Sequence, residues 1–150
     1  MLESLEKKLG VLHQILDLEK EQLEIALQEN PDLEKYDESV DRKTKFMKEL
    51  DRLDEGFTST YELVKDDVQS NPAKYREIVL KMQDTIREAV DLSVEVQAQE
   101  TRNKNAITAA ISRKRRNLKE KHVNTNAALK YYKSMSRINT VDPQLMDHKK

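Results

Sequence analysis

The sequence contains no cysteine, only two glycines and three prolines, and no long run of apolar residues. Without cysteine, a disulfide framework, a thiolate nucleophile and a cysteine-ligated zinc site are all excluded. No apolar run approaches the roughly 20 residues that a helix needs to cross a bilayer, so we expect no stable membrane insertion. The first residues also lack the basic and hydrophobic regions of a signal peptide, and we therefore expect a cytoplasmic protein.

Titratable side chains are abundant, but they form no recognisable catalytic or metal-binding pattern. The three histidines, His13, His122 and His148, lie far apart in the sequence. No glycine-rich phosphate loop is present, and no nucleophile is accompanied by an evident base. We therefore expect no enzymatic activity, no metal site and no cofactor.

The composition that remains, 37 % hydrophobic and 37 % charged, favours long helices with narrow apolar seams. Apolar residues recur at intervals of three and four, and Glu19 falls on the seam of the first segment. In the second segment, Lys43 and Asp54 interrupt the seam, and Gly56 indicates either a bend or a close helix crossing.

Two proline motifs divide the helices. Asn30-Pro31-Asp32 and Ser70-Asn71-Pro72 each combine a residue disfavoured in a helix with a proline suited to the first helical position. We predict helices over about residues 2–29, 32–69 and 72–135, followed by a flexible tail over residues 136–150. The predicted fold is all-α, an elongated antiparallel three-helix bundle or coiled coil with a long C-terminal helix.

The predicted helices differ in length, spanning roughly 42, 57 and 95 Å at 1.5 Å per residue. The third helix must therefore extend beyond the other two, and we expect residues 110–135 to lack intramolecular partners.

Charge is divided along the chain, although the net charge is only −1. The first hundred residues hold 14 bases and 25 acids, a net charge of −11, and the last fifty hold 13 bases and three acids, a net charge of +10. Such a division indicates either an acidic partner for the basic end or pairing between the two parts.

The basic cluster at residues 113–116 has nearly the residue order of a basic leucine-zipper helix, but with the wrong spacing. Three residues separate Asn105 from the pair Ala109 and Ala110, and one separates that pair from Ser112, where the pattern needs two and two. Each one-residue difference in spacing turns a side chain by about 100° around the helix, so the base-reading residues would not share one face. We therefore expect no nucleic-acid partner, and interpret the cluster as a solvated basic face or a patch that pairs with the acidic residues.

Three stretches resemble FliT/FlgN-type flagellar export chaperones of clostridial bacteria. They are residues 50–61 (Leu-Asp-Arg-Leu-Asp-Glu-Gly-Phe-Thr-Ser-Thr-Tyr), 96–104 (Val-Gln-Ala-Gln-Glu-Thr-Arg-Asn-Lys) and 131–135 (Tyr-Tyr-Lys-Ser-Met). Members of this family are small cytosolic helical bundles without enzymatic activity. They keep late flagellar subunits, the filament cap or hook-filament junction proteins, soluble before delivery to the type III export apparatus.

The resemblance implies a client with an aggregation-prone C-terminal helix that lies in a groove of the bundle. It also implies partners among the export-gate or ATPase components, with Tyr131 or Tyr132 as the residue that docks to the gate. In FliT-like proteins a separate fourth helix can fold over the client site, and residues 119–135 would do so here. The apparently unbroken third helix departs from that layout, and a hinge at residues 103–105 or at residues 124–126 would reconcile the two.

As a hypothesis, the client groove uses seam residues of the first two helices or of the expected overhang: Leu9, Leu12, Leu16, Leu23, Met47, Leu50 and Phe57, or Ile107, Ile111 and Leu118. The alternative is a structural or regulatory coiled-coil protein that self-associates through the overhang, for example as a homodimer, head-to-tail by charge. A third interpretation, an amphipathic protein at the membrane surface, is weakened by the shortage of large apolar residues beside Arg113 to Arg116.

Overall fold

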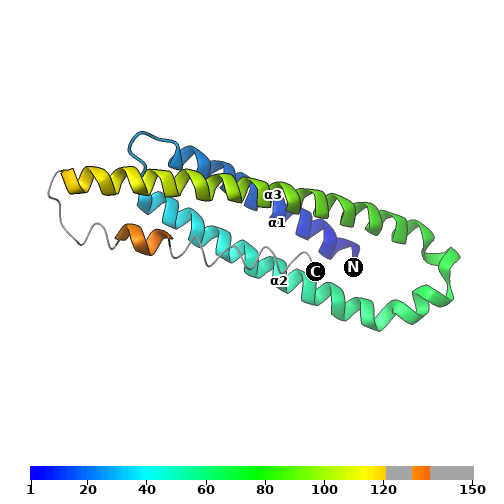
Figure 1. Cartoon of the computed structure of the whole chain (residues 1–150). Helices are drawn as coiled ribbons and strands as arrows, with labels where there is room; N and C mark the ends of the chain where they lie inside the picture. The colour runs from blue at the N-terminus through cyan, green and yellow to red at the C-terminus, as the bar shows by residue number, and fades with distance from the viewer. Residues whose placement is uncertain (121–129, 136–150) are drawn as a thin grey trace.

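The computed structural model describes residues 1–120 and 130–135, and within these ranges the chain is helical with no strand. Three long helices, α1 (Leu2–Ala26), α2 (Leu33–Ser70) and α3 (Pro72–Glu120), lie side by side (Figure 1). A short helical segment follows at residues 130–135. The predicted all-α bundle is confirmed, and each long helix begins within one residue of its predicted start.

Both predicted proline motifs separate helices. At the first, the Asp32 carboxylate accepts hydrogen bonds from the backbone N–H groups of Glu34 and Lys35, at 3.1 and 3.2 Å, and so caps the start of α2. At the second, α3 begins on Pro72 itself. Proline is suited to this position because the first N–H groups of a helix have no intrahelical partner.

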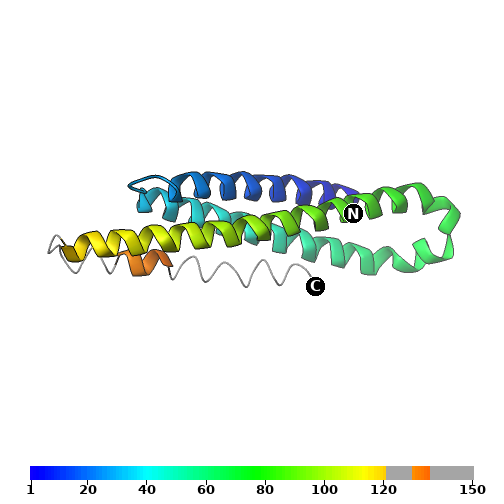
Figure 2. The ribbon, with the colours of Figure 1, turned by 45° about the horizontal axis from the view of Figure 1, so that its top comes forward.

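The three helices differ in length, with 25, 38 and 49 residues in α1, α2 and α3. The shortest helix, α1, packs along both of the others, whereas α2 and α3 contact each other little. Figure 1 shows the N-terminus well short of the turn between α2 and α3, and Figure 2 shows the same elongated arrangement from a second direction. Helix α1 therefore covers only part of the hairpin that α2 and α3 form.

The bundle is held together by two separate apolar cores. The loop-end core, beside the α1–α2 connection, consists of Ile25, Ala26, Leu33, Tyr36, Val40, Ile107, Ala110 and Ile111. The middle core consists of Leu12, Ile15, Leu16, Met47, Leu50, Ala89, Leu92 and Val96. Each core takes side chains from all three helices, which is why residues far apart in the sequence share one apolar interior.

The overhang expected over residues 110–135 needs correction in part: α3 does continue past the α1–α2 connection, where no residue from 112 to 120 is buried (Figure 1). Ala110 and Ile111 are buried in the loop-end core, so residues 110 and 111 do have intramolecular partners. The tight turn before Pro72 places the start of α3 opposite the end of α2, and α1 reaches neither. At this opposite end of the bundle, the part that extends beyond α1 is therefore residues 54–70 of α2 with residues 72–88 of α3, named here the distal hairpin. No residue from 54 to 88 is buried.

The expected single helix over residues 72–135 also needs correction. Helix α3 ends at Glu120, and residues 130–135 lie back beside the start of α2 (Figures 1 and 2). There Lys130 pairs with Glu34, and Tyr131 and Met135 pack against the loop-end core. Burial of these two side chains favours the folded-back position over a projecting helix.

The two candidate hinges have different outcomes. Residues 103–105 are an uninterrupted part of α3, and Asn103 is buried. The prediction of a hinge at this position is therefore wrong. The hinge expected at residues 124–126 and the tail expected over residues 136–150 lie outside the described residues.

Candidate functional site

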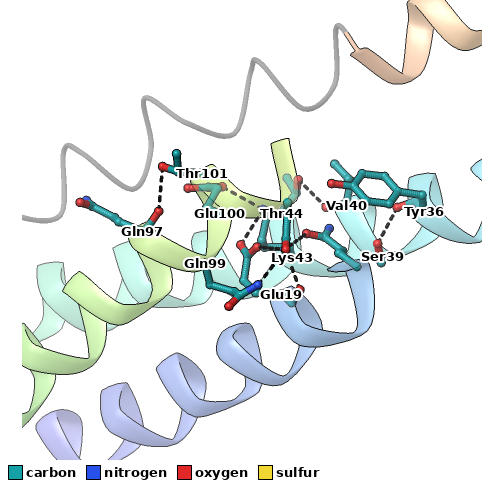
Figure 3. A network of polar contacts seen from close by, with 12 residues as sticks. Glu19, Tyr36, Ser39, Val40, Lys43, Thr44, Gln97, Gln99, Glu100 and Thr101 are labelled. Carbon is teal, nitrogen blue, oxygen red and sulfur yellow. Dashed lines mark hydrogen bonds and ion pairs between the residues drawn. The ribbon is translucent and has the colours of Figure 1, made fainter. Parts of the chain in front are cut away.

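A buried ionic layer separates the two apolar cores. Lys43 of α2 donates hydrogen bonds from Nζ to Glu19 Oε1 of α1 and to Glu100 Oε1 of α3, at 2.8 Å each (Figure 3). Glu19 is 0 %, Lys43 4 % and Glu100 7 % exposed. Each long helix thus contributes one charged residue to the interior, and the Lys43 ammonium lies between the two carboxylates.

Asn103 completes the layer from α3. Its Nδ2 donates to the backbone oxygen of Glu19 at 2.6 Å and to Glu19 Oε2 at 2.5 Å. Its Oδ1 accepts from Gln99 Nε2 at 3.0 Å, so both ends of the buried amide are bonded. The asparagine that the sequence indicated as a hinge joins α3 to α1.

Burial and charge oppose each other in this layer. Burial raises the pKa of Glu19, and the neighbouring Lys43 only partly offsets this effect. Burial acts to lower the pKa of Lys43, but attraction to Glu19 and Glu100 outweighs it, and the pKa of Lys43 is raised. Because the penalty of removing charges from water opposes their attraction, the best-supported role for such a layer is to fix helix register.

The sequence indicated part of this layer. Glu19 and Lys43 were placed on the apolar seams, and a charged residue on a buried seam requires a partner of opposite charge. Glu100 was missed, although it falls on the seam of α3 between Val96 and Asn103 at the same intervals of four and three. Charged residues on the apolar seams of two helices are the signal that would have indicated a charged partner on the seam of the third helix.

The other interruption, Asp54, is paired as well. Lys8 of α1 donates from Nζ to Asp54 Oδ1 at 2.7 Å, and both side chains are partly buried. This ion pair lies near the N-terminal end of α1, where the distal hairpin begins. It therefore marks the boundary between the three-helix part of the molecule and the two-helix part.

The residues predicted for a client groove do not form one open surface. Six of them are buried in the two cores: Leu12, Leu16, Met47, Leu50, Ile107 and Ile111. Four are partly exposed and lie in separate parts of the bundle: Leu9, Leu23, Phe57 and Leu118. The six buried residues hold the three helices together, because α1 itself occupies the groove between the seams of α2 and α3.

An exposed apolar surface lies instead on the distal hairpin. The seam of α2 continues through Phe57, Tyr61, Val64 and Val68, and that of α3 through Tyr75, Val79, Met82 and Ile86. None of these eight residues is buried, and Tyr61 and Ile86 are 40 % and 41 % exposed. Apolar residues at helical spacing without a covering helix are typical of a surface that binds another chain.

A cavity extends this surface toward α1. It has a volume of about 340 Å³ and is lined by Leu5, Lys8, Ile86, Ala89, Val90, Ser93 and Val94. It lies between the first turns of α1 and the middle of α3. The exposed apolar surface of the hairpin is therefore continuous with a hollow at the end of α1.

The two C-terminal tyrosines occupy different environments. The ring of Tyr131 packs against the loop-end core, with Lys114 Nζ 6.0 Å from its centroid. Tyr132 is 52 % exposed, and the guanidinium carbon of Arg115 lies 4.3 Å from its ring centroid. Two members of the basic cluster thus lie over aromatic rings, at distances that favour cation–π attraction.

No family model, curated protein or solved structure matches this chain. Among the residues that the structure describes, no helix is both long and apolar enough to cross a membrane. In the same parts of the chain, no group of three or more histidine, aspartate or glutamate side chains could hold a metal ion.

Proposed function

We propose that this protein is a non-enzymatic cytoplasmic export chaperone. In this proposal it binds the amphipathic C-terminal helix of a late flagellar subunit, either the filament cap or a hook-filament junction protein, and delivers it to the type III export apparatus. The resemblance of residues 50–61, 96–104 and 131–135 to FliT/FlgN-type chaperones supports the proposal.

One structural observation carries the proposal: the apolar seams of α2 and α3 continue, unburied, over residues 54–88. An amphipathic helix binds such a surface by placing its own apolar face between the two seams. Leaving eight large apolar side chains partly exposed costs free energy in the absence of a partner. A chaperone gains from this arrangement because the same residues cover the aggregation-prone face of its client.

The proposal also distinguishes between the two tyrosines. Tyr131 is packed against the loop-end core, whereas Tyr132 is exposed beside Arg115. An exposed aromatic side chain on a short helical segment offers a large contact area to a partner. We therefore assign docking to the export gate to Tyr132.

The test is a pull-down with the full chain as bait from the cytosol of motile source cells, with partners identified by mass. Recovery of a cap or hook-junction subunit, lost when the C-terminal helix of that subunit is deleted, is the expected result. Tyr132→Ala should retain the client and lose the export-apparatus component. Recovery of the bait alone would replace the proposal with the self-associating coiled coil.

A further inference from the structure

We infer that the distal hairpin binds one amphipathic helix of net positive charge from another protein, which lies end to end with α1 as the third helix of the bundle. The inference rests on the proposed function in identifying that helix as part of a client. It adds where the helix lies, how long it is and which charges it carries.

The position follows from the continuity of the interface that α1 already makes. On α2, buried Leu50 is followed at intervals of seven residues, and so on the same face, by Phe57 and Val64. On α3, buried Ala89 is preceded by Ile86 and Met82. Apart from Asp54, which pairs with Lys8, the apolar spacing of both seams continues past the N-terminal end of α1, and only the covering helix is lost. A second helix on the axis of α1 would bury the same two faces in the same way.

The length follows from the extent of the unburied seams. Residues 54–70 and 72–88 each comprise 17 residues, which corresponds to about 26 Å, or about five helical turns. The cavity lined by Leu5 of α1 and by the seam residue Ile86 of α3 lies at the α1 end of these seams. The partner helix is therefore about 17 residues long, with apolar residues at intervals of three and four.

The charge of the hairpin indicates which kind of helix it attracts. Residues 54–88 hold eight acids and five bases, a net charge of −3, and the α2 part alone holds five acids and one base. A second copy of the hairpin would bring another −3 against this surface, and like charges oppose that association. A helix with lysine or arginine beside its apolar face is attracted, most strongly at low ionic strength.

The experiment uses the full chain and two designed fluorescent peptides of about 18 residues. Both carry leucine at intervals of three and four, and the remaining positions are rich in lysine in one and in glutamate in the other. We expect the lysine peptide to bind at least about tenfold more tightly at low salt, with a smaller difference at high salt. Fluorescence polarisation measures both affinities.

Two variants locate the site, and they change the charge by the same amount. Val64→Asp places a carboxylate on the inner seam and should abolish binding. Leu63→Asp, on the outer face of the same turn where Leu63 is 86 % exposed, should leave it unchanged. Circular dichroism verifies that both variants remain helical, as expected because neither residue is buried.

Equal binding to both variants, or equal affinity for both peptides, would overturn the inference. A dimer of the unmodified chain that Val64→Asp dissociates, without peptide binding, would show that a second copy is the occupant. The proposed function fails separately. A client pull-down unaffected by Val64→Asp would leave the chaperone proposal and remove this site. Peptide binding as expected, with no flagellar subunit recovered in the pull-down, would keep this site and remove the chaperone proposal.

Discussion

The three-helix part of the molecule and the distal hairpin have the same apolar spacing and opposite exposure. In the three-helix part, Ile15, Met47 and Val96 are completely buried. In the distal hairpin, the corresponding seam residues Tyr61 and Ile86 are each about two-fifths exposed. The difference arises from α1, which is shorter than α2 and α3. Spacing therefore determines which face of a helix is apolar, whereas the neighbouring helix determines whether that face is covered.

The charged residues differ between the two parts as well. In the three-helix part, Lys43 lies between two buried carboxylates. In the distal hairpin, Lys65 pairs with Glu62 and Arg87 with Asp84 on the surface, within single helices. Surface pairs of this kind contribute little to stability because water and salt screen them, whereas an unpaired buried charge is costly. Substitutions of charged residues should therefore have large effects only in the three-helix part.

The largest effect is expected from Lys43→Met, which leaves Glu19 and Glu100 buried without their shared cation. Breaking a buried ion pair in this way should lower the free energy of unfolding by roughly 3–5 kcal/mol. Urea denaturation followed by circular dichroism measures the loss. Lys45→Met, at an exposed position of the same helix, is the control and should change stability by less than about 0.5 kcal/mol. A loss as small as that of Lys45→Met would contradict the buried pairing of Lys43 with Glu19 and Glu100.

The same variant should change the pH dependence of stability. Because the pKa of Glu19 is raised in the folded state, its contribution to stability is greatest below the ordinary glutamate pKa and is lost as pH rises through the raised value. Removing Lys43 takes away the cation that lowers this pKa, so the effect should be larger in the variant. Relative to the unmodified chain, Lys43→Met should therefore recover stability as the pH falls from neutrality toward the ordinary glutamate pKa. A difference that does not vary with pH would contradict this assignment.

A direct test of the comparison is to shorten one seam residue in each part. Ile15→Ala, at a fully buried position, should cost about 2–5 kcal/mol because it leaves a cavity in the middle core. Val64→Ala, in the distal hairpin, should cost less than about 1 kcal/mol because its side chain is already partly in water. Thermal and urea denaturation measure both. Similar losses at the two positions would mean that the hairpin is covered in solution.

A smaller, local effect is expected at the C-terminal tyrosines. Tyr131→Ala should weaken packing of residues 130–135 on the loop-end core by about 1 kcal/mol and accelerate tryptic cleavage after Lys130 roughly fivefold. Tyr132→Ala, which removes an exposed ring, should leave the cleavage rate nearly unchanged. The opposite result would exchange the packing and docking roles of the two tyrosines.

The smallest effect is expected at Gly56, where the sequence indicated either a bend or a close helix crossing. A Cβ atom at Gly56 would meet no atom of a neighbouring helix within 4 Å, so the close crossing is wrong. Gly56→Ala should therefore raise the free energy of unfolding by about 0.5–1 kcal/mol, since alanine restricts the unfolded chain and favours the helix. Gly10, in α1, has equal room for a Cβ atom, so Gly10→Ala is the matched variant and should give a similar gain. A loss of stability in either variant would contradict the helical environment described for it.

The sequence predicted the helices and their separators because these depend on local chemistry, such as the cap at Asp32 and the proline that begins α3. It also placed Glu19, Lys43 and Asp54 on buried or partly buried seams. It could not identify their partners, because Glu100 and Lys8 meet them only through the stagger of whole helices. The client groove was predicted on apolar seam residues, but α1 covers most of those positions.

That stagger gives the ionic layer a further consequence. If α1 moved by one heptad along α2 and α3, about 10.5 Å, its apolar seam would still match theirs, but Glu19 would leave Lys43 and an apolar residue would replace it. The layer therefore selects one axial position of α1 along α2 and α3. By holding α1 at this position, the layer determines how far the N-terminal end of α1 reaches along the distal hairpin. It thereby determines how much of the hairpin remains uncovered.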